Sequence, residues 1–81
     1  MYIQQVREIV GALLEEQGDT RPFGDKESLV LSRRLSSLQV VELATILEKR
    51  YGLDYAKIGF NQYDFDTVES IAALIISATQ R

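Results

Sequence analysis

The chain contains no cysteine and no histidine among its 81 residues. Without cysteine, disulfide bonds, thiolate zinc sites and a cysteine nucleophile are all excluded. Without histidine, the chain lacks the commonest general base and metal ligand, which excludes a Ser-His-Asp triad and most zinc chemistry. These two absences favour a role that is not enzymatic and that uses no bound metal.

A long hydrophobic run is also missing. The longest uncharged apolar stretch is 70–80, which is shorter than the roughly 20 residues that span a bilayer. Near the beginning, Arg7 and Glu8 form a charge pair where a secretory signal has an apolar run. We therefore expect a soluble, cytoplasmic protein that does not enter a membrane.

Positive charge is scarce, with 9 lysines and arginines against 12 acidic residues and a net charge of −3. Acidic residues dominate 1–19 and 54–70, and 20–36 carries a small basic excess. Nucleic-acid binding needs a basic face or stripe, so a small nucleic-acid binder that uses Arg33 and Arg34 is disfavoured. We interpret these two arginines as a solvated pair in a loop.

Eighty-one residues are enough for one small domain, 1–81. Apolar spacing predicts a helix over 2–17, followed by Gly18 as the left-handed residue beyond its end. The apolar residues on one face of this helix are Ile3, Val6, Ile9, Val10, Leu13 and Leu14. The next segment, 19–36, is long for a connection in a helical bundle, where about 2 to 8 residues are usual. Its apolar residues could pin it across the bundle; they are Pro22, Phe23, Leu29, Leu31 and Leu35.

A second helix is predicted to begin at Ser37, because Ser36 and Gln39 have the spacing of a capping box. Gly52 closes this helix. Its buried stripe consists of Val40, Leu43, Ala44, Leu47 and Tyr51. A neighbouring strip that the core does not need consists of Leu38, Val41 and Thr45.

Two further helical segments are predicted after Gly52. The first is a short turn over 55–59, followed by irregular chain. The second is a helix over 67–79, begun by another capping box in which Asp66 is the cap and Glu69 the third helical residue. Nothing indicates a strand hairpin, so the predicted fold is all-α: a small four-helix bundle with three main helices, one short helix and a long first loop.

Ser37 is the residue best suited to covalent modification. A serine in the first turn of a helix lies among unsatisfied backbone N–H groups at the positive end of the helix dipole, where a phosphate on its oxygen would be stabilised. The surrounding stretch 29–53 resembles the core of acyl and peptidyl carrier proteins, in which Asp-Ser-Leu opens the second helix. Residues that match this pattern are Ser37, Leu38, Glu42, Leu43, Leu47, Glu48, Tyr51, Gly52 and Leu53. Residues 64–71 are similar to the start of the family's last helix.

The resemblance implies a fold of the acyl-carrier type and a function as a free-standing acyl carrier. Ser37 would be esterified by 4′-phosphopantetheine, donated from coenzyme A by a phosphopantetheinyl transferase. The arm would hold acyl or aminoacyl intermediates as thioesters for fatty-acid, polyketide or related synthesis. Acyl-loading and acyl-processing enzymes would be the partners of a chain that we expect to be monomeric. The residues expected to face these partners are Ser36, Leu38, Val41, Glu42 and Thr45.

Two departures from the family pattern motivate an alternative. Ser36 replaces the aspartate that precedes the attachment serine, and the helix over 37–53 carries no net charge where the family's second helix is acidic. The alternative is a degenerate carrier fold that has lost the arm and acts only as a protein interaction module.

Overall fold

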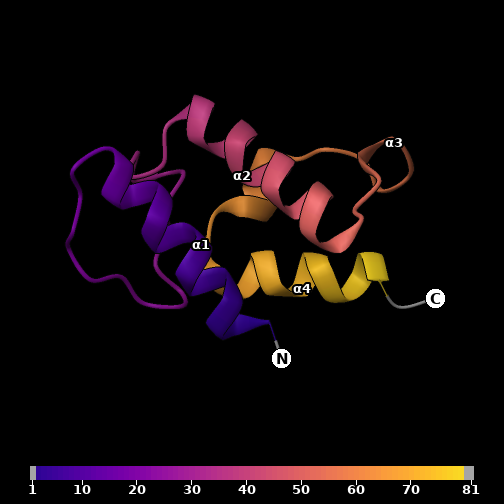
Figure 1. Cartoon of the computed structure of the whole chain (residues 1–81), viewed down its shortest axis with the longest axis horizontal. Helices are drawn as coiled ribbons and strands as arrows, with labels where there is room; N and C mark the ends of the chain where they lie inside the picture. Colours follow the sequence, from indigo (N-terminus) through magenta and orange to yellow (C-terminus); the bar gives the residue numbers. More distant parts are fainter. Residues whose placement is uncertain (1, 80–81) are drawn as a thin grey trace.

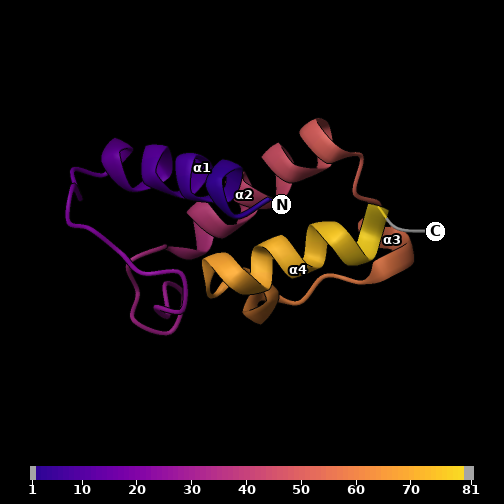
Figure 2. The same ribbon diagram turned by 90° about the horizontal axis from the view of Figure 1, so that it is seen from below.

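The computed structural model describes residues 2–79, and over that range it contains helices and no strands. Three main helices are α1 (Ile3–Glu16), α2 (Ser37–Tyr51) and α4 (Val68–Thr79). Between α2 and α4 lie the single-turn α3 (Tyr55–Ile58) and the 3₁₀ helix η1 (Gln62–Phe65). The all-helical prediction is confirmed at this level, and η1 was not predicted. Figures 1 and 2 place the long loop after α1 and the short α3 at opposite ends of the molecule.

The core lies where α1, α2 and α4 meet. α4 packs against α1 and η1, and α2 contacts both α1 and α4. The predicted stripes supply most of the buried side chains, which include Val6, Val10, Leu14, Leu43, Leu47, Ile71 and Ile75. The apolar periodicity of the sequence therefore identified the inward faces of α1 and α2. No helix within residues 2–79 is both long and apolar enough to cross a membrane.

Gly18 lies just beyond the end of α1, as predicted, and has a positive φ of 82°. The amide of Gly18 donates to the carbonyl of Glu15, and the amide of Asp19 donates to the carbonyl of Leu14. This pair of hydrogen bonds is a Schellman motif, which satisfies the last carbonyls of the helix. It also fixes the backbone of Asp19 directly beside the end of α1.

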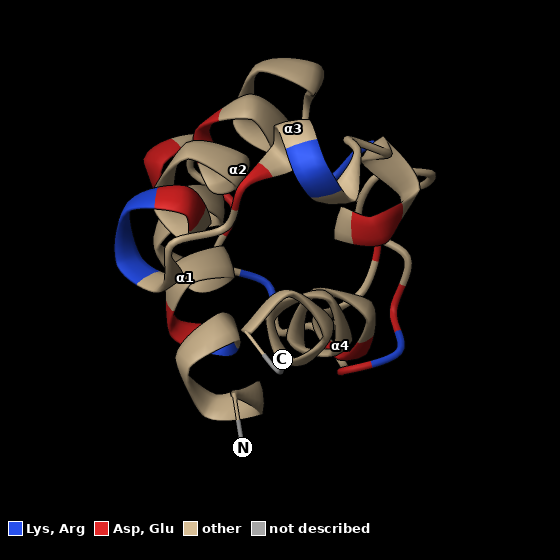
Figure 3. Ribbon diagram, turned by 90° about the vertical axis from the view of Figure 1, so that its right-hand side faces the viewer, with Lys and Arg blue, Asp and Glu red and all other residues tan. Residues whose placement is uncertain are grey.

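The start of α4 differs from the prediction. Thr67, and not Asp66, caps the helix: its Oγ1 accepts from the amide of Ser70 at 3.0 Å, and the Ser70 Oγ accepts from the amide of Thr67 at 3.1 Å. The capping box predicted between Asp66 and Glu69 is wrong, because the carboxylate of Asp66 is engaged by the long loop instead. α4 has one acidic residue in its first turn, Glu69, and Figure 3 shows this helix nearly end-on and almost free of charged residues.

α3 is held against α2 by Tyr55. Its hydroxyl donates to the carbonyl of Ala44 at 2.7 Å. Burial, with a smaller contribution from the nearby charge of Glu48, raises the pKa of Tyr55 to about 12. The Tyr55 ring also packs edge-on against Phe60, which in turn lies against the buried Phe65 of η1. This aromatic group closes the end of the bundle near α3.

Two apolar residues of the long loop enter the core: Leu29 and Leu35 are buried, whereas Leu31 is exposed. Polar contacts hold the rest of the loop. The carboxylate of Asp25 accepts two hydrogen bonds from the Arg7 guanidinium of α1, both at 2.7 Å. The carbonyl of Asp25 accepts from the amide of Glu69 in α4. The loop is therefore attached to two helices as well as packed on the core.

Candidate functional site

Ser37 is the first residue of the 15-residue α2, and its side chain is exposed. The predicted capping box is confirmed: the Ser36 Oγ accepts from the amide of Gln39 at 3.2 Å, and the Gln39 Oε1 accepts from the amide of Ser36 at 3.1 Å. The cap and the candidate attachment residue are therefore different serines. Ser37 is not required to complete the start of the helix.

The polar groups around Ser37 can receive an anion. Within residues 2–79, the Ser37 hydroxyl and the backbone amides of Ser37 and Leu38 make no hydrogen bond, whereas the amides of Gln39 and Val40 bond to Ser36. Two amides at the positive end of a helix dipole are a suitable environment for phosphate oxygens. An ester at the Ser37 oxygen would place its phosphate beside them.

A solvent-open pocket of about 490 Å³ lies beside Ser37. One wall is the start of α2, a second is the end of the long loop, and a third is η1. The lining residues are Val30, Leu31, Arg33, Leu35, Ser36, Ser37, Val40, Gln62 and Tyr63. The pocket combines apolar walls with the polar helix start, so it can accept a chain that has both polar and apolar parts. The sequence did not predict it, because η1 is distant in sequence from the other two walls and meets them only in the folded chain.

Asp66 holds the loop wall of this pocket in place. Its carboxylate accepts from the hydroxyl of Ser28 at 2.8 Å and from the amides of Val30 and Leu31 at 2.9 and 3.1 Å. Burial raises the pKa of Asp66, but the hydrogen bonds from Ser28 and the loop amides outweigh that effect and leave the pKa below its ordinary value. The side chain that was expected to cap α4 therefore shapes the pocket.

The predicted partner-facing residues lie outside the core. Leu38 is 70% exposed and Val41 is 55% exposed; Ser36 and Thr45 are also exposed, and Glu42 is half-buried. The Thr45 hydroxyl donates to the carbonyl of Val41 at 2.9 Å, so its methyl group remains to contact a partner.

Large exposed hydrophobic residues occur on one part of the described chain. They are Leu31, Leu38, Val41, Ile58, Phe60 and Tyr63, and none of them belongs to α1 or α4. Leu31 and Tyr63 also line the pocket beside Ser37. Exposed apolar side chains beside a pocket are typical of a binding surface.

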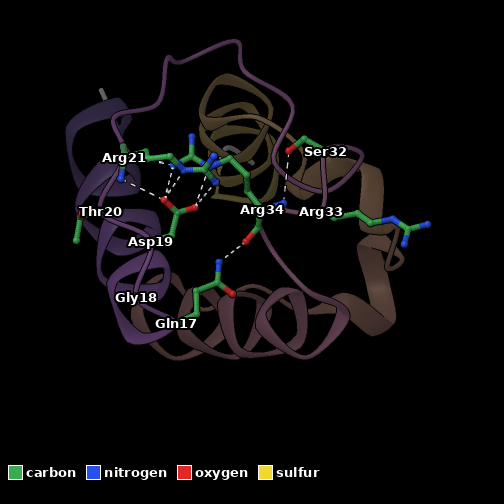
Figure 4. A pocket seen from close by; sticks show the side chains of 8 residues that line it. All are labelled: Gln17, Gly18, Asp19, Thr20, Arg21, Ser32, Arg33 and Arg34. Carbon is green, nitrogen blue, oxygen red and sulfur yellow. Dashed lines mark hydrogen bonds and ion pairs between the residues drawn. The ribbon is translucent and has the colours of Figure 1, made fainter.

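Arg34 overturns the interpretation of Arg33 and Arg34 as a solvated pair. Arg34 is 9% exposed, and Figure 4 shows its guanidinium turned toward Asp19 while Arg33 points away. The carboxylate of Asp19 accepts from Nε and Nη2 of Arg34, both at 3.1 Å. Hydrogen bonds from Arg21, and then from Arg34, hold the pKa of Asp19 well below its usual range. Sequence reasoning missed this cluster because residues 15 apart in a loop give no periodic signal.

The described part of the chain contains no group of side chains suited to hold a metal ion. Comparison with known proteins found no matching family model, no matching curated protein and no matching solved structure. The fold and the site therefore define a small all-helical protein with an exposed serine at a helix start, a pocket beside it and exposed apolar side chains at the rim of that pocket.

Proposed function

We propose that this protein is an acyl carrier, which holds acyl or aminoacyl groups as thioesters on a 4′-phosphopantetheine arm joined to Ser37. The observation that carries the proposal is the exposed Ser37 hydroxyl at the first position of α2, beside a pocket of about 490 Å³. The all-helical architecture and the long first loop further support a fold of the acyl-carrier type. A carrier of this kind catalyses no reaction itself.

The residues present fit the arm. Attachment joins the Ser37 oxygen to the phosphorus that bears pantetheine in coenzyme A; adenosine 3′,5′-bisphosphate leaves, and the hydroxyl proton passes to a base of the transferase. The amides of Ser37 and Leu38 can then bond the phosphate oxygens. The bound group supplies a thiol, which a chain without cysteine lacks. A short tether gives the cargo an effective concentration in about the millimolar range at a docked enzyme.

Partner enzymes would dock on the exposed apolar side chains next to Ser37. Leu38 and Val41 project from α2 on the side that the core does not use. We propose that these residues, with Ser36, Glu42 and Thr45, contact the phosphopantetheinyl transferase and the enzymes that load and process the cargo. A few side chains near the centre of an interface supply most of its binding energy.

Substitution of Ser37 tests the proposal. Incubation with a broad-specificity transferase and a fluorescent coenzyme A analogue should label the wild-type chain, and Ser37→Ala should abolish labelling. Helix content and melting temperature should stay close to the wild type, because Ser36 supplies the cap and alanine is a good helix former.

Ser77→Ala is the matched control, because Ser77 is an exposed serine of α4 that the proposal does not use. It should be labelled at the wild-type rate. Labelling that persists in Ser37→Ala would place the attachment at another residue. A wild-type chain that is never labelled would overturn the proposal and favour an interaction module without an arm.

A further inference from the structure

The guanidinium of Arg34 is fully used within the protein. Arginine has five N–H donors, and each of those in Arg34 meets an acceptor. Besides the two bonds to the Asp19 carboxylate, Nη1 donates to the carbonyl of Pro22 at 3.1 Å and to the Glu27 carboxylate at 2.8 Å. Nη2 also donates to the carbonyl of Arg21 at 2.8 Å. No donor remains for a ligand, so the cluster works on the protein itself.

This arrangement gathers the long loop around one side chain. Arg34, near the end of the loop, bonds to four residues of the loop's first half. They are Asp19, Arg21, Pro22 and Glu27. Asp19 is itself fixed to the end of α1 by the Schellman motif. The guanidinium therefore ties the segment before α2 to α1. We call this set, Asp19, Glu27 and Arg34 with the two carbonyls, the Arg34 clamp.

The backbone that leads from the clamp to Ser37 is also held at each step. The Gln17 side chain donates to the carbonyl of Arg34, and the amide of Leu35 donates to the carbonyl of Leu29. The amide of Ser36 donates to Gln39, whose Nε2 donates to the carbonyl of Leu13 in α1 at 2.7 Å. Every residue between the guanidinium and Ser37 thus has a fixed backbone contact.

Arg33 indicates that this path is constrained. It has a positive φ of 66°, which only a few per cent of residues other than glycine adopt. Such a conformation persists only where the surrounding contacts determine it. The amide of Arg33 donates to the carbonyl of Val30 at 3.0 Å, and its neighbour Arg34 is the most heavily bonded side chain of the loop, so a local turn and the clamp hold this conformation together.

We propose that Arg34 is a positioning residue for Ser37: the clamp sets the direction in which the chain enters α2 and thereby the presentation of the Ser37 hydroxyl to the transferase. The inference rests on the proposed function for the reaction at Ser37, while the clamp itself can be tested without it. A buried ion pair adds little net stability over apolar packing, which agrees with a role in fixing geometry. Lysine cannot replace Arg34 fully, because it has three donors and no planar fork.

Amide hydrogen exchange in Arg34→Gln tests the clamp directly. Exchange of the Leu35 and Ser36 amides should speed up by about tenfold or more, while core amides such as those of Val10 and Leu43 keep their order of protection. Arg7→Gln is the matched control: it removes another two-bond arginine–aspartate pair from the same loop, but one that does not hold the segment before α2. It should leave the Leu35 and Ser36 amides unchanged.

Loading kinetics at a temperature where every variant is folded give the second measurement. In Arg34→Gln, kcat for loading of the carrier should fall by about 10- to 100-fold, as expected for a misplaced reacting group, with little change in KM because the apolar docking residues remain. Arg34→Lys should give intermediate values, and it replaces Arg34→Gln in both measurements if the glutamine variant does not fold. Arg7→Gln should load like the wild type.

Three results distinguish a failure of the clamp, a failure of its role at Ser37 and a failure of the proposed function. Unchanged exchange at Leu35 and Ser36 in Arg34→Gln, or an equal increase at every amide, would overturn the clamp. Altered exchange with unchanged kcat would overturn its role in presenting Ser37. A wild-type chain that is never loaded would overturn the proposed function, and the exchange data would still decide whether the clamp holds the segment before α2.

Discussion

Arg33 and Arg34 are adjacent residues of the same type in opposite surroundings. Arg33 is exposed at the rim of the pocket beside Ser37, whereas Arg34 is buried among two carboxylates and two carbonyls. A guanidinium that leaves water must find an acceptor for each donor, because an unpaired buried charge is costly. Asp19 and Glu27, together with the carbonyls of Arg21 and Pro22, supply these acceptors, which is why the loop can bury Arg34 and leave its neighbour in solvent.

The clamp makes stability depend on pH at acidic values. Hydrogen bonds from Arg21 and Arg34 lower the pKa of Asp19 below its ordinary value of 3.8. A carboxylate with a lowered pKa in the folded state stabilises that state above its ordinary pKa, and this contribution is lost as the pH falls through the lowered value. Asp19→Asn should therefore be less stable than the wild type at pH 7, and the difference should shrink as the pH falls below about 4.

Denaturant unfolding of both proteins at several pH values between 7 and 2.5 measures this difference. Glu27 contributes in the same direction, because hydrogen bonds from Arg34 and from the Gly24 amide lower its pKa. A difference in unfolding free energy that stays constant, or widens, toward pH 2.5 would contradict the assignment of Asp19 as an ionised partner of Arg34.

At the scale of single elements, the beginning of α4 shows how two adjacent polar residues divide their roles. Thr67 caps the helix with Ser70, and Asp66 binds the loop. Thr67→Ala should therefore lower the free energy of unfolding by about 0.5 to 2 kcal/mol. Glu69→Ala, at the position that the sequence assigned to the capping box, should change it by less than about 0.5 kcal/mol. Thermal or denaturant unfolding of both variants measures this, and equal losses would contradict the observed cap.

α2 has two apolar faces with different roles. Leu47 is fully buried, so Leu47→Ala should cost about 2 to 5 kcal/mol of unfolding free energy. Leu38 is largely exposed, so Leu38→Gln should cost less than about 0.5 kcal/mol and yet slow loading of Ser37. Denaturant unfolding measures the unfolding free energy of each variant, and initial rates measure the loading of Ser37. A stability loss in Leu38→Gln as large as that in Leu47→Ala would show that the faces are reversed.

The sequence predicted the main helices well, because a helix with one buried face repeats its apolar residues at a fixed period. That signal located α1, α2 and α4 within a residue or two at each end. The preference of serine for helix starts located the cap at Ser36, and the preference of glycine for helix ends located Gly18 and Gly52. At the start of α4, Asp66 and Thr67 are both good caps. The choice between them depends on the long loop, which competes for Asp66, and local sequence does not contain that information.

At the scale of the whole molecule, the long loop joins the three main helices and forms part of the candidate site. Asp25 connects it to α1 and α4, Asp66 holds its second half against the start of α4, and Arg34 ties its end to the beginning. The exposed apolar residues lie on the loop, α2 and the α3–η1 region. The sequence predicted the position of Ser37 from the capping box at Ser36, and it predicted the exposed strip of Leu38 and Val41 from the helical repeat. It could not predict the pocket or the clamp, because tertiary contacts between irregular segments create both.

The central claim is that Ser37 carries a phosphopantetheine arm, and the intact mass of the chain tests it most directly. The chain is co-expressed with a broad-specificity phosphopantetheinyl transferase and a well-behaved carrier protein as an internal control. We predict that the purified chain gains the mass of one phosphopantetheinyl group, and that fragmentation places the group on the peptide containing Ser37. An unmodified chain from cells in which the control carrier is fully modified would contradict the claim.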